Sequence, residues 1–72
     1  MIGIICAMQI EADGIIDLCE NVKIKTDKKM NFILGTLHGK EVCVVVCGVG
    51  KVNAAMCALL LIEKYNPEII IN

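Results

Sequence analysis

Three short apolar runs rich in isoleucine and valine constrain the fold of this chain more than any other feature. They occupy residues 2–7, 41–47 and 69–71. Runs of this length with almost no polar interruption are typical of strands buried on both faces of a sheet. Residues 10–19 and 51–66 lie between them and carry apolar side chains at helical spacing. Strands that alternate with helices predict an α/β fold, with a mostly parallel mixed sheet flanked by helices.

A predicted β-hairpin precedes the central apolar run. Residues 21–26 alternate apolar and lysine side chains, which indicates a strand with one face in water. Residues 30–37 form the second predicted strand, and the polar segments 27–29 and 38–40 form the turns. The hairpin therefore leads into a central strand over residues 41–47.

The predicted helix over residues 51–66 has no charged residue between positions 54 and 62 and ends before Pro67. A helix that is apolar all round must be covered on more than one side. We expect one face on the sheet and the other on a second subunit, with Ala58 on the outer face. Two helices cannot cover both faces of a sheet of four or five strands. Residues 1–72 are therefore expected to be an incomplete, truncated N-terminal portion of a single larger domain.

Charge and hydropathy exclude two classes of partner. The chain has 7 lysines, no arginine and 8 acidic residues, for a net charge of −1. It therefore offers no basic surface for a nucleic acid backbone. No apolar run approaches the roughly 18 residues that a membrane span requires, and the N-terminus lacks the pattern of a signal peptide. We expect a cytoplasmic protein that binds neither nucleic acid nor membrane.

The cysteines favour buried, reduced thiols. There are 5 of them, an odd number, none in a Cys-x-x-Cys pair, and His38 is the only histidine. This pattern does not support a disulfide framework or a metal site. Cys43 and Cys47 fall on one face of the predicted central strand, and His38 lies in the turn at the opposite end of that strand. The cysteines are therefore interpreted as packing residues and not as nucleophiles.

A glycine-rich turn follows the central strand and allows two interpretations. Gly48-Val49-Gly50-Lys51 stands between a strand and a helix, where backbone N–H groups can bind a phosphate. The complete phosphate-loop and dinucleotide patterns are absent, because Val52 and Asn53 replace required residues. The simpler interpretation, that the glycines let the chain turn sharply, is favoured.

Glu11 is the candidate catalytic residue. It follows the first strand, at the sheet edge where ligands of open α/β folds bind if the first and central strands are parallel neighbours. A carboxylate at that place can act as a general base. From the residues alone, the favoured interpretation is a solvent-facing residue in the first turn of a helix, where its charge suits the helix dipole.

Four segments together resemble a known family. They are Ile2–Glu11, with the pattern Gly-Ile-Ile-x-Ala-Met-x-x-Glu, then Gly35–Val42, Cys47–Ala55, with Gly-Val-Gly-Lys-Val, and Pro67–Asn72. The chain resembles the N-terminal part of the 5′-methylthioadenosine/S-adenosylhomocysteine nucleosidases, in the purine nucleoside phosphorylase superfamily. The resemblance implies a phosphorylase/hydrolase-like fold and hydrolysis of the N-glycosidic bond to adenine and the thio-ribose product. It also implies a role in methionine salvage.

The resemblance assigns roles to four residues. It implies that Glu11 activates water for attack on C1′ of the ribose, that Ala7 and Met8 border the ribose site, and that Val49 contacts the sugar. It further implies a small-molecule nucleoside substrate, no metal or other cofactor, and a homodimer. Gln9 and Ile10 stand where this family often has acidic residues, so the field around the base differs.

Two alternatives remain open. One is a nucleoside phosphorylase of the same superfamily, which would hold phosphate with arginines. The absence of arginine from this sequence favours the hydrolase. The other is a non-catalytic truncated fragment stabilised by oligomerisation.

Overall fold

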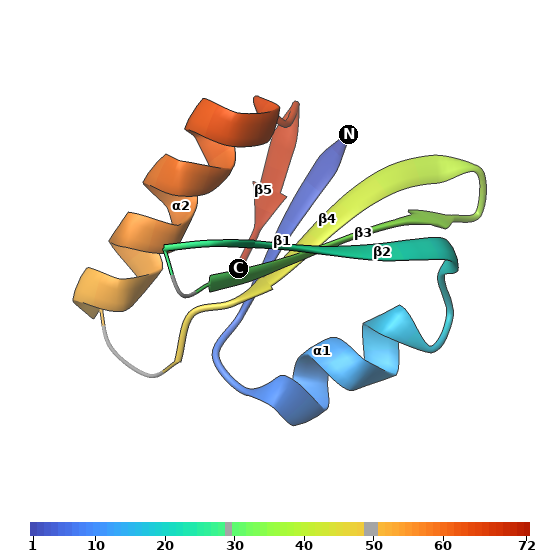
Figure 1. Ribbon diagram of the computed structural model, residues 1–72, viewed down its shortest axis with the longest axis horizontal. Helices are drawn as coiled ribbons and strands as arrows, with labels where there is room; N and C mark the ends of the chain where they lie inside the picture. The colour runs from blue at the N-terminus through green and yellow to red at the C-terminus, as the bar shows by residue number, and fades with distance from the viewer. Residues whose placement is uncertain (29, 49–50) are drawn as a thin grey trace.

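Five strands and two helices make up the computed structural model of the protein (Figure 1). It describes residues 1–28, 30–48 and 51–72, with residues 51–53 described by their helical backbone alone. In chain order the elements are β1 (Ile2–Cys6), α1 (Gln9–Ile16), β2 (Glu20–Asp27), β3 (Met30–Leu37), β4 (Lys40–Val46), α2 (Lys51–Tyr65) and β5 (Ile69–Ile71). The predicted order of strands and helices is confirmed. No helix among these residues is long and apolar enough to cross a bilayer.

The strands form one mixed sheet in the order β2-β3-β4-β1-β5. β1 pairs in parallel with β4 on one side and with β5 on the other, whereas β2, β3 and β4 are antiparallel. The α/β class and the mixed sheet are confirmed, and the parallel part of the sheet consists of β4, β1 and β5. The carboxyl ends of these parallel strands therefore meet at one edge of the sheet.

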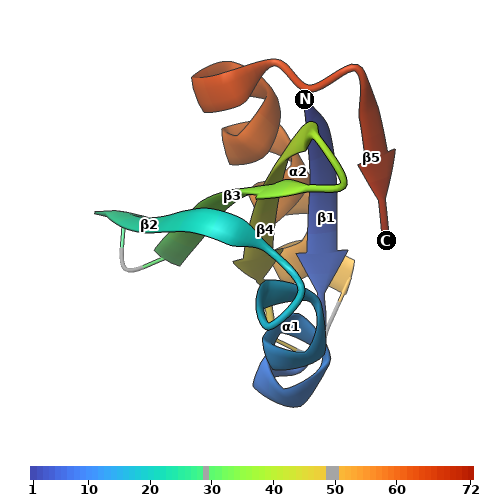
Figure 2. The ribbon, with the colours of Figure 1, turned by 90° about the vertical axis from the view of Figure 1, so that its right-hand side faces the viewer.

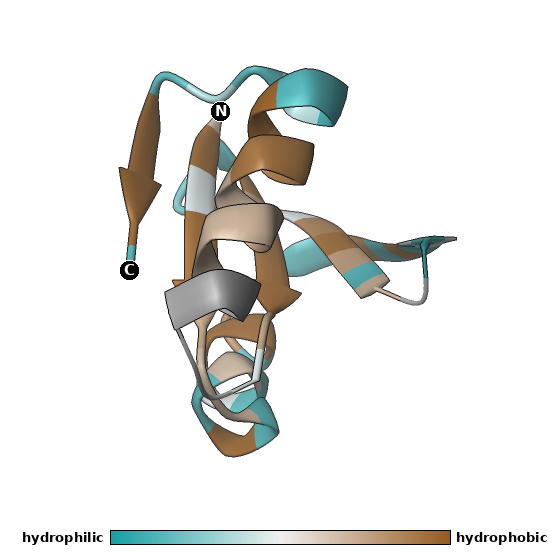
Figure 3. Ribbon diagram, turned by 90° about the vertical axis from the view of Figure 1, so that its left-hand side faces the viewer, coloured by the Kyte–Doolittle hydropathy of each residue, from teal (hydrophilic) through white to brown (hydrophobic). Residues whose placement is uncertain are grey.

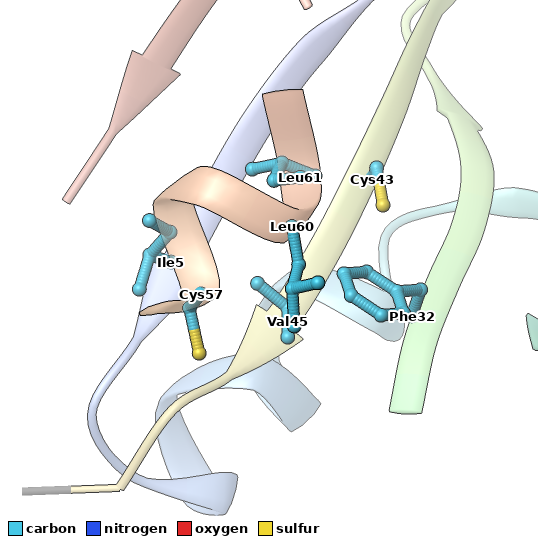
Figure 4. Close-up of a cluster of buried hydrophobic side chains, with 7 residues drawn as sticks. All are labelled: Ile5, Phe32, Cys43, Val45, Cys57, Leu60 and Leu61. Atoms are coloured by element: carbon cyan, nitrogen blue, oxygen red, sulfur yellow. The ribbon is translucent and has the colours of Figure 1, made fainter. Parts of the chain in front are cut away.

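The two helices cover opposite faces of the sheet (Figure 2). Strand β4 is buried on both sides because successive side chains point to opposite faces. Cys43 and Val45 pack with α2, while Val44 packs with α1. The larger cluster, drawn in Figure 4 and called the α2 cluster below, consists of Ile5, Phe32, Cys43, Val45, Cys57, Leu60 and Leu61. The continuous apolar run of β4 thus follows from its central place between two helices.

Gly3 allows α2 to pack closely on β1. A Cβ atom at Gly3 would lie 2.6 Å from Cδ2 of Leu61 and 3.3 Å from Cγ of Pro67. Leu61 is fully buried, so its side chain has little room to move away. Any larger residue at position 3 would therefore push the helix and the strand apart.

The sheet covers α2 on one side, but one residue predicted for the outer face lies elsewhere. Met56, Leu59 and Ile62 face outward, with exposed fractions of 50%, 57% and 47%. Ala58 is half-buried and packs against the α2 cluster, so its predicted place on the outer face is wrong. The register of the helix differs because Cys57, Leu60 and Leu61 fill the core more completely than Ala58 would.

Two other apolar surfaces remain exposed. Val22 and Ile24 of β2 are exposed, so the expected dry face of this strand is absent among the described residues. Ile69 and Ile71 of β5 are also more than half exposed, while Ile70 between them packs on the α2 cluster. The apolar parts of α2 and β5 are coloured brown in Figure 3.

Candidate functional site

A pocket of about 290 Å³ lies at the carboxyl edge of the parallel strands. Its lining residues are Ile4, Ile5, Cys6, Ala7, Glu11, Ile15, Ile71 and Asn72. Figure 2 shows β1 and β5 running side by side toward the end of the molecule where α1 begins. The walls are aliphatic side chains and a thiol, and the remaining polar side chains of the lining are those of Glu11 and Asn72. An apolar pocket with a few polar groups is typical of a small-molecule site.

Glu11 combines the two roles that the sequence left open. Its Oε1 atom accepts a hydrogen bond from the backbone N–H of Met8 at 3.1 Å, so the carboxylate caps the first turn of α1. The residue is exposed, and it also lines the pocket. The bond to Met8 holds the carboxylate at the mouth of the pocket, so the cap positions a group that is able to accept a proton.

Of the three other expected site residues, the structure describes Ala7 and Met8. Ala7 lines the pocket together with Glu11. Met8 is not among the lining residues, and its side chain is 53% exposed, but its backbone N–H orients Glu11. Val49 lies outside the described residues, as does Gly50. The structure thus brings together Ala7 and the backbone of Met8, from the loop between β1 and α1, and Glu11, from the first turn of α1.

Gly48 supports the turn interpretation of the glycine-rich segment. Its φ angle is 78°, a left-handed conformation that glycine adopts without steric cost. Cys47, just before it, donates its backbone N–H to the carbonyl of Cys6 at 2.9 Å. The chain therefore leaves β4 beside the end of β1, and the start of this turn lies close to the pocket edge.

All five cysteines are free thiols, and three of them, Cys6, Cys43 and Cys57, are buried. Burial raises the pKa of the Cys6 thiol in the pocket, and the nearby Glu11 carboxylate and Cys47 thiol raise it further. Burial also raises the pKa of the Cys43 thiol to about 11. A thiol with a raised pKa stays protonated at neutral pH and is a poor nucleophile. Cys6 therefore contributes an uncharged wall to the pocket.

No metal-binding cluster is found in the described part of the chain, where no group of three or more His, Cys, Asp or Glu side chains could hold an ion. His38 has a φ angle of 51° in the turn between β3 and β4. This turn is at the amino end of β4, away from the pocket at the carboxyl edge. The prediction that His38 lies at the opposite end of the strand from Cys47 is confirmed.

Sequence reasoning missed the part of the pocket that β5 contributes. Ile71 and Asn72 line it because β5 pairs in parallel with β1, with Ile4 opposite Ile71. The tendency of consecutive strands to lie side by side did not indicate this pairing, because β1 lies between β4 and β5 in the sheet. Ile15 of α1 completes the wall and was identified only as a helix residue.

Comparisons with known proteins give one consistent family. A sequence model described as "Phosphorylase superfamily" matches residues 1–72. The 5′-methylthioadenosine/S-adenosylhomocysteine nucleosidase of Shewanella halifaxensis is 45% identical over 71 residues, which cover 99% of this chain and 31% of that protein. The chain thus spans about a third of the length of this curated relative.

Solved structures of nucleosidases have the same fold. The Neisseria meningitidis 5′-methylthioadenosine/S-adenosylhomocysteine nucleosidase, in complex with methylthio-immucillin-A, is similar with a TM-score of 0.91 and 29% identity, over 96% of this chain and 30% of that one. The Streptococcus pneumoniae enzyme, in complex with 8-aminoadenine, has a TM-score of 0.92 and 29% identity, over 96% of this chain and 31% of that one. The expected phosphorylase/hydrolase-like fold is confirmed. Because the family match extends over the whole sequence and the fold agrees, this chain belongs to the phosphorylase superfamily.

Proposed function

We propose that the full-length protein that carries residues 1–72 hydrolyses the N-glycosidic bond of 5′-methylthioadenosine and S-adenosylhomocysteine, and that these residues are the N-terminal portion of its single nucleosidase domain. The observation that carries the proposal is the carboxylate of Glu11 at the mouth of an otherwise mostly apolar pocket. The identity of 45% to a nucleosidase with this activity in its name supports the choice of substrates.

In the proposed reaction Glu11 acts as the general base. The oxygen of a water molecule bonds to C1′ of the ribose as the bond from C1′ to the purine nitrogen breaks. The carboxylate accepts a proton from this water, while the purine leaves with the bonding electrons and takes up a proton to become adenine. Positive charge develops on the ribose in this type of reaction, so a negative carboxylate nearby also stabilises the transition state.

The other pocket residues support this reaction by their shape and apolar character. We assign Ala7 and Met8 to the border of the ribose site and Val49 to contact with the sugar. Ile4, Ile15 and Ile71 form an aliphatic wall against which a small molecule can pack. The reaction as written needs neither a metal ion nor an organic cofactor.

Phosphorolysis is the competing reaction in this superfamily. A phosphate nucleophile requires cationic side chains, and the lining residues of the described pocket include none. The sequence also has no arginine. Both observations favour water as the nucleophile.

The decisive experiment is adenine release from 5′-methylthioadenosine by the full-length protein, with and without phosphate. We expect release without phosphate and a fall in turnover of at least about 100-fold in Glu11→Gln, with nucleoside binding retained. Glutamine keeps the size of the side chain but cannot accept the proton. Strict dependence on phosphate would identify a phosphorylase, and unchanged turnover in Glu11→Gln would leave Glu11 with the capping role alone.

A chain that consists only of residues 1–72 should release no adenine. The described pocket offers a base but no aromatic side chain for the purine among its lining residues. Groups that act as a unit lose most of their effect when one is absent. Adenine release by a mass-verified preparation of this segment, abolished by Glu11→Gln, would contradict this expectation. A full-length protein that lacks activity would favour the non-catalytic alternative.

We also propose a cytoplasmic homodimer with a role in methionine salvage. The outward row of Met56, Leu59 and Ile62 on α2 supports self-association, because apolar side chains at helical spacing form a contiguous dry surface when paired. Leu59→Glu should weaken association in sedimentation experiments, whereas Glu63→Gln on the same helix should not. A wild-type protein that stays monomeric at high concentration would refute the dimer.

A further inference from the structure

Two residues with polar side chains, from different parts of the fold, line the same pocket. Glu11 comes from the first turn of α1, and Asn72 follows β5 directly. The parallel register places Ile71 opposite Ile4 of β1, so Asn72 lies beside the end of the strand that leads to Glu11. Of these two residues, the proposed reaction gives a role only to Glu11, and the carboxamide of Asn72 has none.

An attacking water needs more than one partner to be held in place. Ordered waters in proteins make about three hydrogen bonds, and aliphatic walls offer none. Glu11 accepts one proton of the water. A second acceptor for the other proton leaves an oxygen lone pair free to point at the sugar carbon. The carboxamide oxygen of asparagine is such an acceptor, and it carries no charge that would compete for the proton.

We propose that Asn72 is a positioning residue that holds the attacking water together with Glu11. This inference rests on the proposed hydrolysis and adds a second residue to the same site. The carboxamide oxygen accepts one water proton while the Glu11 carboxylate takes the other during attack. Asn72 thus orients the nucleophile and exchanges no proton itself.

The test compares two substitutions of similar size in the full-length protein. Asn72→Leu keeps the volume but removes the acceptor, so kcat for 5′-methylthioadenosine should fall about 100-fold while KM changes less than about three-fold. Asn31→Leu is the matched control, since Asn31 is exposed on β3 and does not line the pocket, and its kinetics should equal those of the wild type. Melting temperatures establish that each variant is folded.

Asn72→Asp keeps an acceptor oxygen and adds a charge next to Glu11. At alkaline pH it should restore most of the kcat that Asn72→Leu loses. Its acidic limb in the pH profile of kcat/KM should move to higher pH, because neighbouring carboxylates disfavour each other's ionisation. The Cys6 thiol lies near the Glu11 carboxylate, and the Cys47 thiol lies near Cys6. Asp13 follows two residues later on α1 and accepts a hydrogen bond from Gln9 at 2.8 Å. All are unchanged in the variant, so the shift reports on position 72.

The outcomes separate the two proposals. Adenine release by the wild type and its loss in Glu11→Gln test the hydrolysis itself. Within an active enzyme, an unchanged kcat in Asn72→Leu, or a raised KM at constant kcat, overturns the positioning role. If Asn72→Leu does not fold, an unshifted acidic limb in Asn72→Asp overturns it. A wild type that releases no adenine overturns both proposals.

Discussion

The two helices cover opposite faces of the same sheet, yet they are held in different ways. α2 has 15 residues and buries Cys57, Leu60 and Leu61 against the sheet. α1 has 8 residues and buries Ala12 alone, and its start is fixed by the bond between Glu11 and Met8. α2 thus stabilises the core, while α1 positions a polar group. A small buried area suffices for α1 because a hydrogen bond at its first turn sets the place of the carboxylate.

The C-terminal end of α2 makes further contacts with β2 and β3. The Tyr65 ring lies 5.8 Å from the Phe32 ring, and Lys64 Nζ lies 3.2 Å from Asp27 Oδ2. The ion pair is partly exposed and contributes little, but the aromatic pair joins α2 to the buried part of β3. Removing packing from α2 should therefore affect stability, whereas removing Glu11 should affect activity.

The largest expected effect is at Leu61. Replacing this fully buried side chain by alanine should lower the free energy of unfolding by about 2–5 kcal/mol, because a cavity remains between α2 and β1. Leu59→Ala is the matched control on the same helix, since Leu59 is exposed, and it should cost less than about 1 kcal/mol in the monomer. Urea denaturation measures both. Equal losses would mean that α2 does not pack in this register.

Substitutions of two glycines test how closely each helix is packed. Gly3→Ala should destabilise the protein by about 1–3 kcal/mol, because its Cβ atom would meet the buried Leu61. Gly14→Ala in α1 should stabilise it by about 0.5–1 kcal/mol, because no atom lies within 4 Å of the new Cβ and alanine favours a helix. Thermal unfolding of both variants measures the difference. A stabilising Gly3→Ala would show that α2 sits farther from β1.

An effect of similar size to that of the glycine substitutions is expected above neutral pH. Burial, with a smaller effect of the Cys47 thiol, raises the pKa of the Cys57 thiol from 9.0 to about 11. The folded state then keeps a proton that the unfolded chain releases, so the free energy of unfolding should fall as the pH rises from about 9 toward 11. The loss is about 1 kcal/mol at pH 10. Denaturation curves should show a shallower fall in Cys57→Ala, and identical slopes would contradict the assignment.

Much of the fold was predictable from local sequence. The strands and helices follow from apolar periodicity, and Gly48 adopts the left-handed conformation expected of a glycine turn. The place of Glu11 after the first strand made it a candidate, and the resemblance to the nucleosidase family assigned its catalytic role. Ala58 was wrongly assigned to the outer face of α2. A helix that is apolar all round contains no sequence signal for which side faces the sheet. Strand β2 was predicted to have one buried face, but Val22 and Ile24 are exposed. Burial of that face requires a second layer of structure, which the local sequence pattern does not reveal.

The sequence by itself determined the order of strands and helices, since periodicity and turn residues act over a few neighbouring positions. It also determined that Glu11 stands at the start of a helix. Only the tertiary structure decided that Asn72 shares a pocket with Glu11, because this arrangement depends on β5 pairing with β1 across more than sixty residues of chain. Tertiary packing likewise decided which side of α2 is buried, since the choice depends on how Gly3, Leu60 and Leu61 fit together in space.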